Sequence, residues 1–406
     1  MHSRLISLAI ALTIIPLPVT ASIQTNSKCT KVGDLKFANN QTFVCMKKGG
    51  TTTWQSPAIA PAIGPTGGYI YQYVGKKQQR KAANNRWLVG DTRKEVHFDP
   101  IRVAAYKSIN SLSVDPSFAN IKFEFVVPSG YPKSVRPTVQ LQLEKVASRF
   151  SPLLSKQELV KIVLITEKDK SWVKSELPKI VPPDEYGGAL NILDYYGTKE
   201  KFYSRAGTGG GIAGYIPDKG YSFYISHTSS LATPETYWPE VPPHEFTHML
   251  QGILSGGFRA DFPDGHPEAK WQGHLIEGSA NTLGMALAFE NIGWYSDEMD
   301  RLLKRDIQTF SSWRKMKTVD DAVAFIKAIE VRDSDQTNQF SYSAGQFVWE
   351  YFIGKHGVNK FIEFLSNIPQ TSNFNENLKT TIGMDREAFY KEAGAYLLKN
   401  WQRIAD

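Results

Sequence analysis

The most informative part of the sequence is Pro242-Pro243-His244-Glu245-Phe246-Thr247-His248-Met249-Leu250-Gln251, a His-Glu-x-x-His sequence at the start of a predicted helix. Four residues make nearly one helical turn, so His244 and His248 are expected to project from one face and to reach one metal ion. Glu245 lies about 100° around the helix, where it can contact the reacting water without being a ligand. This spacing favours two zinc ligands and a general base, with two ordinary surface histidines as the alternative.

A third ligand is expected downstream, because a catalytic zinc site uses three protein ligands and one open position. Glu277 opens an apolar helix, and the small residues behind it would let that helix lie close against the first one. Two alternatives stay open: Glu277 as a helix N-terminal carboxylate that faces the macrodipole, and His274 as the third ligand. Asn281 shares the face of Glu277 and could orient a ligating histidine.

The His-Glu-x-x-His sequence, followed by Trp-x-x-x-x-x-Glu-Gly-x-Ala at residues 271–280, resembles the gluzincins, the thermolysin-like clan of zinc metallopeptidases. The resemblance implies one Zn²⁺ per chain, with Glu277 as the third ligand and Glu245 as the general base. Metzincins carry Gly and His at the positions of Gln251 and Leu254, so that branch is excluded.

A second resemblance lies at Tyr342-Ser343-Ala344-Gly345, which is similar to the Tyr-x-x-Gly helix start of gluzincin aminopeptidases. It implies that the Tyr342 hydroxyl donates to the oxyanion that develops on the substrate carbonyl; an ordinary helix-start aromatic residue is the alternative. The Gly-x-Met-Glu-Asn loop with which aminopeptidases capture a free amine is missing from the sequence. The strand predicted at 221–227 is similar to the edge strand that binds extended substrate in these folds.

The first 21 residues predict a signal peptide. A weakly positive start containing Arg4 precedes the apolar run Leu5–Ile15, and Val19-Thr20-Ala21 is a small-residue exit. The apolar run is too short to span a bilayer as a stable helix. We therefore expect secretion, with association at the cell envelope through an uncleaved signal segment as the minority outcome.

The two cysteines, Cys29 and Cys45, form an even pair close to the mature N-terminus, which in an exported protein predicts a disulfide. The residues between them predict a hairpin with its turn near Asn39-Asn40, which Trp54 could cover. A metal site of two cysteines is the alternative, but no histidine lies nearby in the sequence. We expect a small disulfide module at 22–54 and a Pro/Gly/Ala-rich linker at 55–85.

Residues 86–406 predict a single α+β domain with an N-terminal mixed-sheet lobe and a helical C-terminal lobe, which the resemblance makes zincin-like. Strands are predicted at 121–127, 160–166 and 221–226, with a helix at 135–150. The Gly-rich stretch 206–214 is interpreted as a flexible loop leading into a strand. Helices are predicted at 243–254, 276–290, 297–312, 319–330, 342–355, 358–366 and 386–403.

The composition excludes several other classes of protein. Charged residues make up 21% of the 406 residues without long runs of one sign, which argues against disorder. The net charge of +7 is scattered and no nucleic-acid-binding module is recognisable, so we expect a peptide or protein substrate and no nucleic-acid partner. The sequence thus predicts a secreted zinc peptidase. A catalytically degenerate exported binding or envelope protein, and a zinc hydrolase of a non-peptide amide, are the alternatives.

Overall fold

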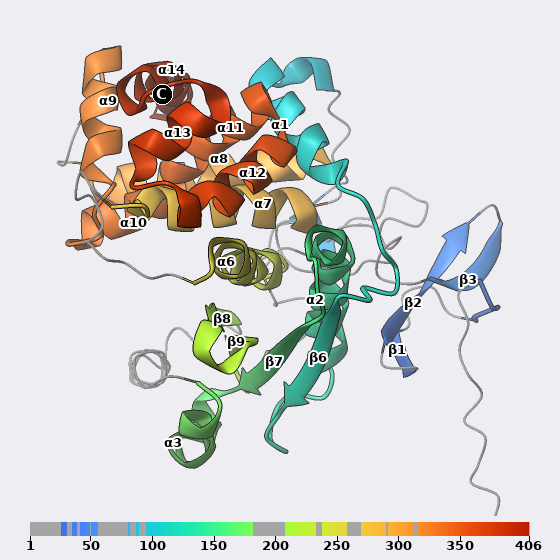
Figure 1. The fold of residues 1–406 in the computed structure, drawn as a ribbon. Helices are drawn as coiled ribbons and strands as arrows, with labels where there is room; N and C mark the ends of the chain where they lie inside the picture. The colour runs from blue at the N-terminus through green and yellow to red at the C-terminus, as the bar shows by residue number, and fades with distance from the viewer. Residues whose placement is uncertain are drawn as a thin grey trace, which may run out of the picture.

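In the computed structural model of the chain, the described residues are 26–30, 35–38, 41–48, 50–55, 80–81, 87–88, 95–181, 208–232, 238–257, 269–289, 291–311 and 315–405. The predicted signal peptide and most of the predicted linker lie outside them. The described part is a mixture of α and β structure and is mostly helical, with one four-stranded mixed sheet (Figure 1).

The four-stranded sheet has the order β6 (Ile121–Val126), β7 (Glu158–Ile165), β9 (Tyr221–Thr228) and β8 (Thr208–Ile216). The first three strands are parallel, and β8 runs antiparallel to β9. The expectation that the strand at 221–227 lies at the sheet edge is therefore wrong, because β9 is hydrogen-bonded on both sides. The edge strand next to β9 is β8.

Strand β7 is almost continuously apolar because both of its faces are covered. Val160, Ile162 and Leu164 join the main core, whereas Val163 and Ile165 join a second cluster on the other face of the sheet. Successive side chains of a strand point to opposite faces, so a strand covered on both faces needs apolar residues at every position. Helix α3 (Lys170–Glu176) supplies part of the second cover through Val173.

The Gly-rich stretch forms strand β8, so its interpretation as a loop is wrong. Glycine has a low intrinsic preference for strands, and this preference misled the prediction. Helix α6 (Val241–Ser255) approaches β8 so closely that a Cβ atom on Gly211 would lie 2.5 Å from Cγ of Glu245. The strand therefore needs glycine at this position for the helix to pack against it.

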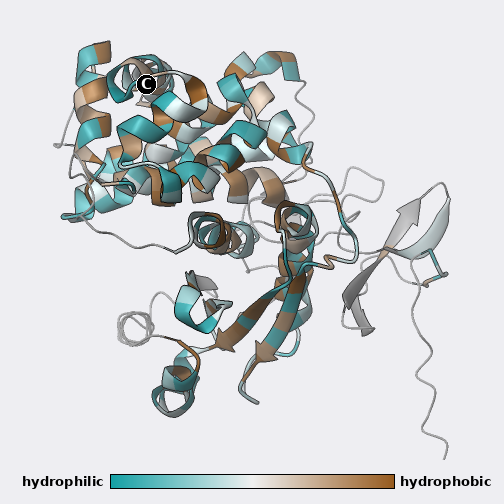
Figure 2. Cartoon of the chain, viewed as in Figure 1, coloured by the Kyte–Doolittle hydropathy of each residue, from teal (hydrophilic) through white to brown (hydrophobic). Residues whose placement is uncertain are grey.

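The remaining main helices are α1 (Pro100–Asn110), α2 (Arg136–Phe150), α7 (Ser279–Ala288), α8 (Ile292–Thr309), α9 (Val319–Ala328), α10 (Asp335–Ser343), α11 (Gly345–His356), α12 (Val358–Asn367), α13 (Phe374–Ile382) and α14 (Arg386–Ala405). Helices were predicted at the positions of α2, α6, α7, α8, α9, α11, α12 and α14, while α1, α3, α10 and α13 were missed. The predicted helix at 342–355 is divided at Ala344 into the end of α10 and the start of α11. Figure 2 shows hydrophobic and hydrophilic residues interspersed along the helices, as one-sided burial requires.

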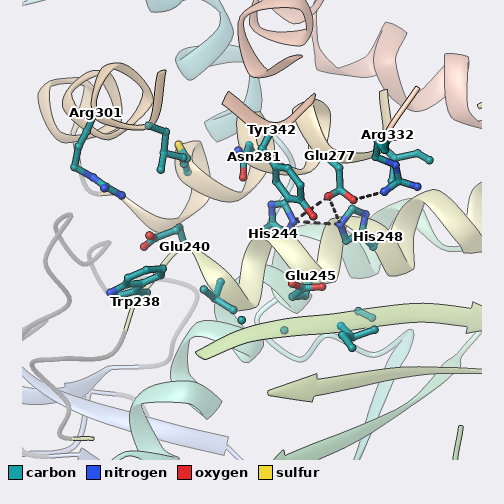
Figure 3. Close-up of a pocket in the computed structure, with 18 of the residues that line it drawn as sticks. Trp238, Glu240, His244, Glu245, His248, Glu277, Asn281, Arg301, Arg332 and Tyr342 are labelled. Carbon is teal, nitrogen blue, oxygen red and sulfur yellow. Dashed lines mark hydrogen bonds and ion pairs between the residues drawn. The ribbon is translucent and has the colours of Figure 1, made fainter. Parts of the chain in front are cut away.

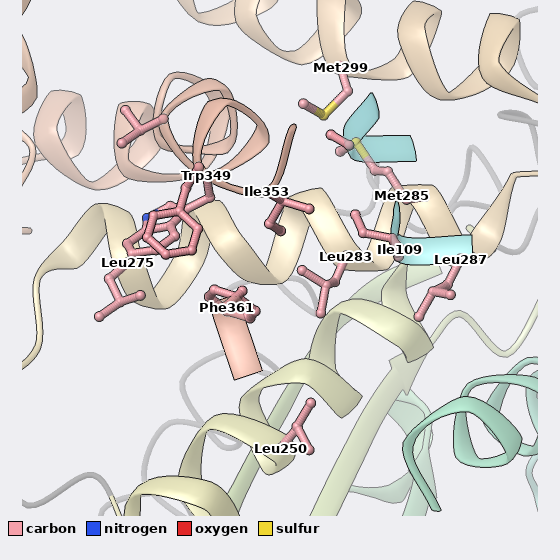
Figure 4. Packing of buried hydrophobic residues seen from close by; sticks show 14 of the residues in the cluster. Ile109, Leu250, Leu275, Leu283, Met285, Leu287, Met299, Trp349, Ile353 and Phe361 are labelled. Atoms are coloured by element: carbon pink, nitrogen blue, oxygen red, sulfur yellow. The ribbon is translucent and has the colours of Figure 1, made fainter. Parts of the chain in front are cut away.

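Helix α6 lies between the sheet and the C-terminal helices (Figure 1). One continuous core joins the two parts, and Figure 4 shows Leu250 of α6 below Leu283 and Leu287 of α7. Further along, Ile353 and Phe361 from α11 and α12 are buried in the same cluster. Each such fully buried side chain contributes about 1.5–3 kcal/mol relative to exposure, so α6 is held firmly on both sides.

A second, small sheet contains β1 (Leu35–Ala38), β2 (Gln41–Lys48) and β3 (Thr51–Gln55), all antiparallel. Ala38 pairs with Gln41, which confirms the predicted hairpin. Cys29 and Cys45 are joined by a disulfide, and Trp54 packs against both. Two further short strands, β4 (Arg80–Lys81) and β5 (Trp87–Leu88), pair with each other.

Within the described residues, none of the helices combines the length and apolar character that crossing a membrane requires.

Candidate metal centre

Helix α6 carries the two histidines at its N-terminal end. Pro242 and Pro243 lie in the first turn, where their missing N–H groups cost no intrahelical hydrogen bond. The helix ends at Gly256, which adopts the left-handed conformation with φ of 73°. His244 and His248 are both buried, and their Nε2 atoms lie 3.1 Å apart. The spacing thus brings both imidazoles to one point, as the sequence predicted.

Glu277 approaches these histidines from a second segment. It lies in a single π-helical turn, His274–Gly278, which runs directly into α7. Its Oε2 atom is 3.2 Å from Nε2 of His248 and 3.6 Å from Nε2 of His244 (Figure 3). Such π turns often occur at functional sites, because the extra residue redirects side chains without ending the helix.

Three glycines allow these segments to come so close. A Cβ atom on Gly284 of α7 would lie 2.8 Å from the backbone nitrogen of His244. A Cβ atom on Gly278 would lie only 2.3 Å from the carbonyl carbon of Gly345, the first residue of α11. The close approach that the small residues predicted is therefore confirmed, and α11 takes part in it.

The site contains a buried group that could hold a metal ion. The ligating atoms of His244, Glu245 and His248 all lie within 4.8 Å of one another. Among the described residues, Oε2 of Glu277 has no hydrogen-bond partner, although it contacts both imidazoles. The other oxygen, Oε1, is 2.6 Å from Nη1 of Arg332. Two imidazole nitrogens and a carboxylate oxygen therefore converge on one point.

Gln251 holds His248 from behind. Its Oε1 lies 2.9 Å from Nδ1 of His248, and its Nε2 donates to Ser279 Oγ at 2.8 Å and to the Ile276 carbonyl at 3.0 Å. Since the amide group must donate to Ser279 and Ile276, its oxygen faces His248 and accepts from Nδ1–H. In its neutral form His248 therefore carries its hydrogen on Nδ1 and directs the Nε2 lone pair into the site. Gln251 is completely buried and ties α6 to the π turn that carries Glu277.

His274, the alternative third ligand, is turned away from the site. Trp349 Nε1–H donates to its Nδ1 at 3.2 Å, and its Nε2 lies 2.8 Å from the Tyr390 hydroxyl. Tyr390 in turn donates to Glu330 at 2.6 Å. Both ring nitrogens are thus used within the helical core, and burial followed by the charge of Arg386 lowers the pKa of His274 to about 3. This geometry excludes His274 as a ligand alongside His244.

Asn281 lies in the wall of the cavity at the site, but its role differs from the expected one. Its Nδ2 donates to Oε1 of Gln346 at 3.4 Å rather than to a histidine. The expectation that Asn281 orients a ligating histidine is therefore wrong. Gln251 makes that contact, with His248.

Glu245 occupies the side of α6 that faces the sheet. The backbone N–H of Gly211 in β8 hydrogen-bonds to its carboxylate. Burial raises the pKa of Glu245, and the two histidines oppose this shift. A carboxylate with a raised pKa, beside but outside the group of His244, His248 and Glu277, is suited to accept and return a proton.

Tyr342 lies on the other side of His244. The two rings are stacked, with centroids 5.8 Å apart and an interplanar angle of 14°. Burial, followed by the Glu277 and Glu245 carboxylates, raises the pKa of Tyr342 well above its ordinary value, so the hydroxyl stays protonated as a donor. Figure 3 shows this hydroxyl pointing toward the space between His244 and Glu277. Tyr342 belongs to the end of α10 instead of a helix start.

The two charged ligand candidates influence each other. Burial alone would lower the pKa of His248, but the Glu277 carboxylate, together with Glu245 and Gln251, raises it to about 9. Burial would likewise raise the pKa of Glu277, but His248 and His244 together hold that pKa well below its ordinary value. Glu277 is therefore ionised at neutral pH, which is the form that binds a metal ion.

One cavity of about 670 Å³ extends from Arg332 past the histidines to Trp238, Glu240 and Arg301, and Glu245, Glu277 and Tyr342 also line it (Figure 3). Gln251 and Arg332 belong to the site but were not predicted from the sequence. Gln251 follows His248 by three residues, and this spacing is a local signal that the two side chains share a helix face. Arg332 lies between α9 and α10, and no local pattern connects it with Glu277.

No protein-family model, curated protein or solved structure matches this chain.

Proposed function

We propose that this chain is a secreted zinc-dependent peptidase of the gluzincin type. His244, His248 and Glu277 would hold Zn²⁺, Glu245 would be the general base, and Tyr342 would donate to the substrate oxyanion. The observation that supports this most strongly is the convergence of the three donor atoms of His244, His248 and Glu277.

The spacing of these donor atoms fits a tetrahedral zinc site. Zinc–nitrogen and zinc–oxygen distances of about 2.0–2.1 Å place any two tetrahedral ligands about 3.3–3.4 Å apart. The three observed separations are 3.1, 3.2 and 3.6 Å. Two imidazoles and one carboxylate are also a donor set of catalytic zinc sites, which leave a fourth position open. The unsatisfied Oε2 of Glu277 further supports a cation at this point.

A zinc ion bound there would supply Lewis acidity toward the substrate carbonyl. Glu245 would take a proton from the attacking water and return it to the leaving amine, for which its raised pKa is suited. Tyr342 would hold its hydroxyl hydrogen toward the carbonyl oxygen as negative charge develops there. Arg332 and Gln251 would keep Glu277 and His248 oriented.

The arrangement around the site supports a zincin-like architecture. A mixed sheet packs on one side of the His-Glu-x-x-His helix and a helical lobe on the other. Residues Gly210–Ala213 of β8 line the cavity, and among the described strands β8 pairs only with β9. The outer edge of β8 is thus suited to pair with an extended peptide.

The remaining predictions complete the proposal. The Cys29–Cys45 disulfide supports an oxidising compartment, in line with the predicted signal peptide. We propose that the N-terminal segment with its disulfide is a small module, joined by the linker at 55–85 to the domain at 86–406. The partner is a peptide or protein substrate.

The test is the zinc content of the mature protein, residues 22–406, prepared without chelators and measured by elemental analysis. We expect about one zinc per chain, lost in His248→Ala. A mixture of unrelated peptides, analysed by mass spectrometry, should be cleaved by the wild type but not by Glu245→Gln, which should keep its zinc. Zinc without peptide cleavage would favour hydrolysis of a non-peptide amide. Absence of zinc would overturn the proposal in favour of a binding protein.

A further inference from the structure

We propose that the cavity contains, beside the metal centre, a subsite for an organic cation formed by Glu240 and Trp238. This subsite would select substrates that carry a basic side chain or a free amino group next to the cleaved bond. That the bound molecule is a substrate rests on the proposed function, but the cation binding itself depends on residues outside the metal centre.

Glu240 lies one helical turn before His244. Its backbone carbonyl accepts the His244 N–H at 3.0 Å, so the two residues are held about 6 Å apart along the helix axis. Both side chains line the same cavity. A group bound at Glu240 can therefore belong to the same peptide as the bond that is cleaved at the metal centre.

The charged groups at this end of the cavity do not compensate Glu240 fully. Arg301 is the cation in the wall, but its Nε lies 2.9 and 2.8 Å from the two carboxylate oxygens of Glu298. Glu298 is therefore the hydrogen-bonded partner of Arg301. Burial, followed by the charge of Glu298, raises the pKa of Glu240 to about 8, and the charge of Arg301 opposes this shift only in part. Oε2 of Glu240 is buried and has no hydrogen-bond partner among the described residues. A buried carboxylate without a partner is unfavourable, and a bound cation would relieve that cost.

The surroundings of Glu240 favour an organic cation over a metal ion. Trp238 lies at the same end of the cavity, is 37% exposed, and offers an aromatic face to a cation (Figure 3). Met285 and Leu302 complete an apolar wall that suits the methylene groups of a lysine or arginine side chain. Calcium or magnesium would require several oxygen ligands, whereas the described residues that line this end of the cavity offer a single carboxylate, that of Glu240.

An ammonium group can come from a basic side chain or from a free N-terminus, and three hexapeptide amides distinguish these sources. The first is acetylated and carries one central lysine. The second is acetylated and carries norleucine in its place. The third carries norleucine and a free N-terminus. Their dissociation constants are measured by calorimetry on zinc-loaded Glu245→Gln protein, so that hydrolysis does not interfere.

We expect the lysine peptide or the free-amine peptide to bind about tenfold or more tightly than the acetylated norleucine peptide. Glu240→Gln should abolish this preference, whereas Glu124→Gln, an exposed residue on β6, should preserve it. Tighter binding of the lysine peptide identifies a side-chain subsite, and tighter binding of the free-amine peptide identifies recognition of the N-terminus.

Equal binding of all three peptides, or no binding, would overturn the inference. A preference that survives Glu240→Gln would remove Glu240 from the subsite. Failure of this inference differs from failure of the proposed function. A protein that cleaves peptides without discriminating between cations refutes the subsite alone, and one that discriminates but never cleaves refutes the peptidase.

Discussion

Arg332 and Glu277 form an ion pair through one carboxylate oxygen only: Nη1 lies 2.6 Å from Oε1, while Oε2 faces the two histidines. Because Arg332 occupies Oε1, a metal ion between the histidines would meet Glu277 as a ligand through the single oxygen Oε2. The arginine thereby fixes the orientation of the carboxylate. Its guanidinium also keeps positive charge on the side of Glu277 that faces away from the imidazoles.

Replacement of Arg332 should weaken zinc binding. In Arg332→Gln the Glu277 carboxylate loses its outer partner, and such losses reduce metal affinity by about 10–100-fold. Arg332→Lys should recover part of the affinity, because a lysine keeps the charge but not the planar geometry. Competition with a chromophoric chelator measures the zinc dissociation constant. Unchanged affinity in Arg332→Gln would show that Glu277 is oriented without it.

The Tyr342 hydroxyl should act in catalysis and not in metal binding. Tyr342→Phe keeps the ring stacked on His244 but removes the donor, so kcat should fall by about 10²–10³-fold while zinc content and KM stay close to wild type. Steady-state kinetics on a cleaved peptide provides the measurement. Tyr106→Phe is the matched control. It also removes a tyrosine hydroxyl, but that hydroxyl donates to the Phe289 carbonyl and does not line the cavity. A Tyr342→Phe variant with wild-type kcat would contradict the assigned role.

Gln251 should govern both stability and zinc affinity. Gln251→Met leaves the buried Nδ1–H of His248 without its acceptor, which should cost about 1–3 kcal/mol of unfolding free energy and reduce zinc affinity about 10–100-fold. Gln251→Glu keeps an acceptor for His248 and should retain more of the zinc affinity. Urea unfolding and zinc titration measure the two effects. Equal zinc affinity in both variants would refute a role through the histidine tautomer.

The contact between Gly278 and Gly345 should tolerate no side chain. In Gly278→Ala the new Cβ would overlap the backbone of α11, so the helices must separate, at a cost of about 1–3 kcal/mol of unfolding free energy. Zinc affinity should fall as well, because Glu277 moves with the helix. Gly210→Ala is the control, since its Cβ would meet nothing within 4 Å. Similar urea midpoints for both variants would contradict this account.

Two buried histidines should make the fold sensitive to acid. Burial lowers the pKa of His227 to about 4, and burial followed by Arg386 lowers that of His274 to about 3. In the unfolded chain both would titrate near 6.5. Their contribution to stability is complete above about pH 6.5 and declines as the pH falls, by about 1.4 kcal/mol per pH unit for each histidine down to about pH 4.

Urea unfolding between pH 7 and pH 4 measures this slope. His274→Gln should flatten it by about half, whereas replacement of the exposed His97 by Gln should leave it unchanged. A slope that His274→Gln does not alter would mean that other groups cause the acid sensitivity.

Local features of the fold followed from the sequence with little help from packing. The one-turn spacing of His244 and His248 follows from helix geometry, which depends only on the backbone. The end of α6 followed from Gly256, whose left-handed conformation a residue with a side chain adopts at a cost. The hairpin between the two cysteines is likewise local, since its strands are adjacent in the chain.

The predictions failed where a segment depends on distant neighbours. Glycines 209–211 disfavour a strand by intrinsic preference, yet β8 forms because β9 pairs with it and α6 packs against Gly211. The break of the predicted helix at Ala344 has the same origin, since α11 must begin where Gly345 crosses Gly278.

The sequence alone was enough to place His244 and His248 on one face of a helix and Glu245 beside them, because the helical repeat dictates which residues share a face. That Glu277 rather than His274 lies against these histidines became clear from the folded chain. Glu277 contacts His248, whereas His274 contacts Tyr390 in the helical core. The same holds for Arg332 and Glu240, whose positions depend on how whole helices pack. Packing depends on side-chain volumes and on contacts between residues far apart in the chain, and a local sequence pattern does not contain this information.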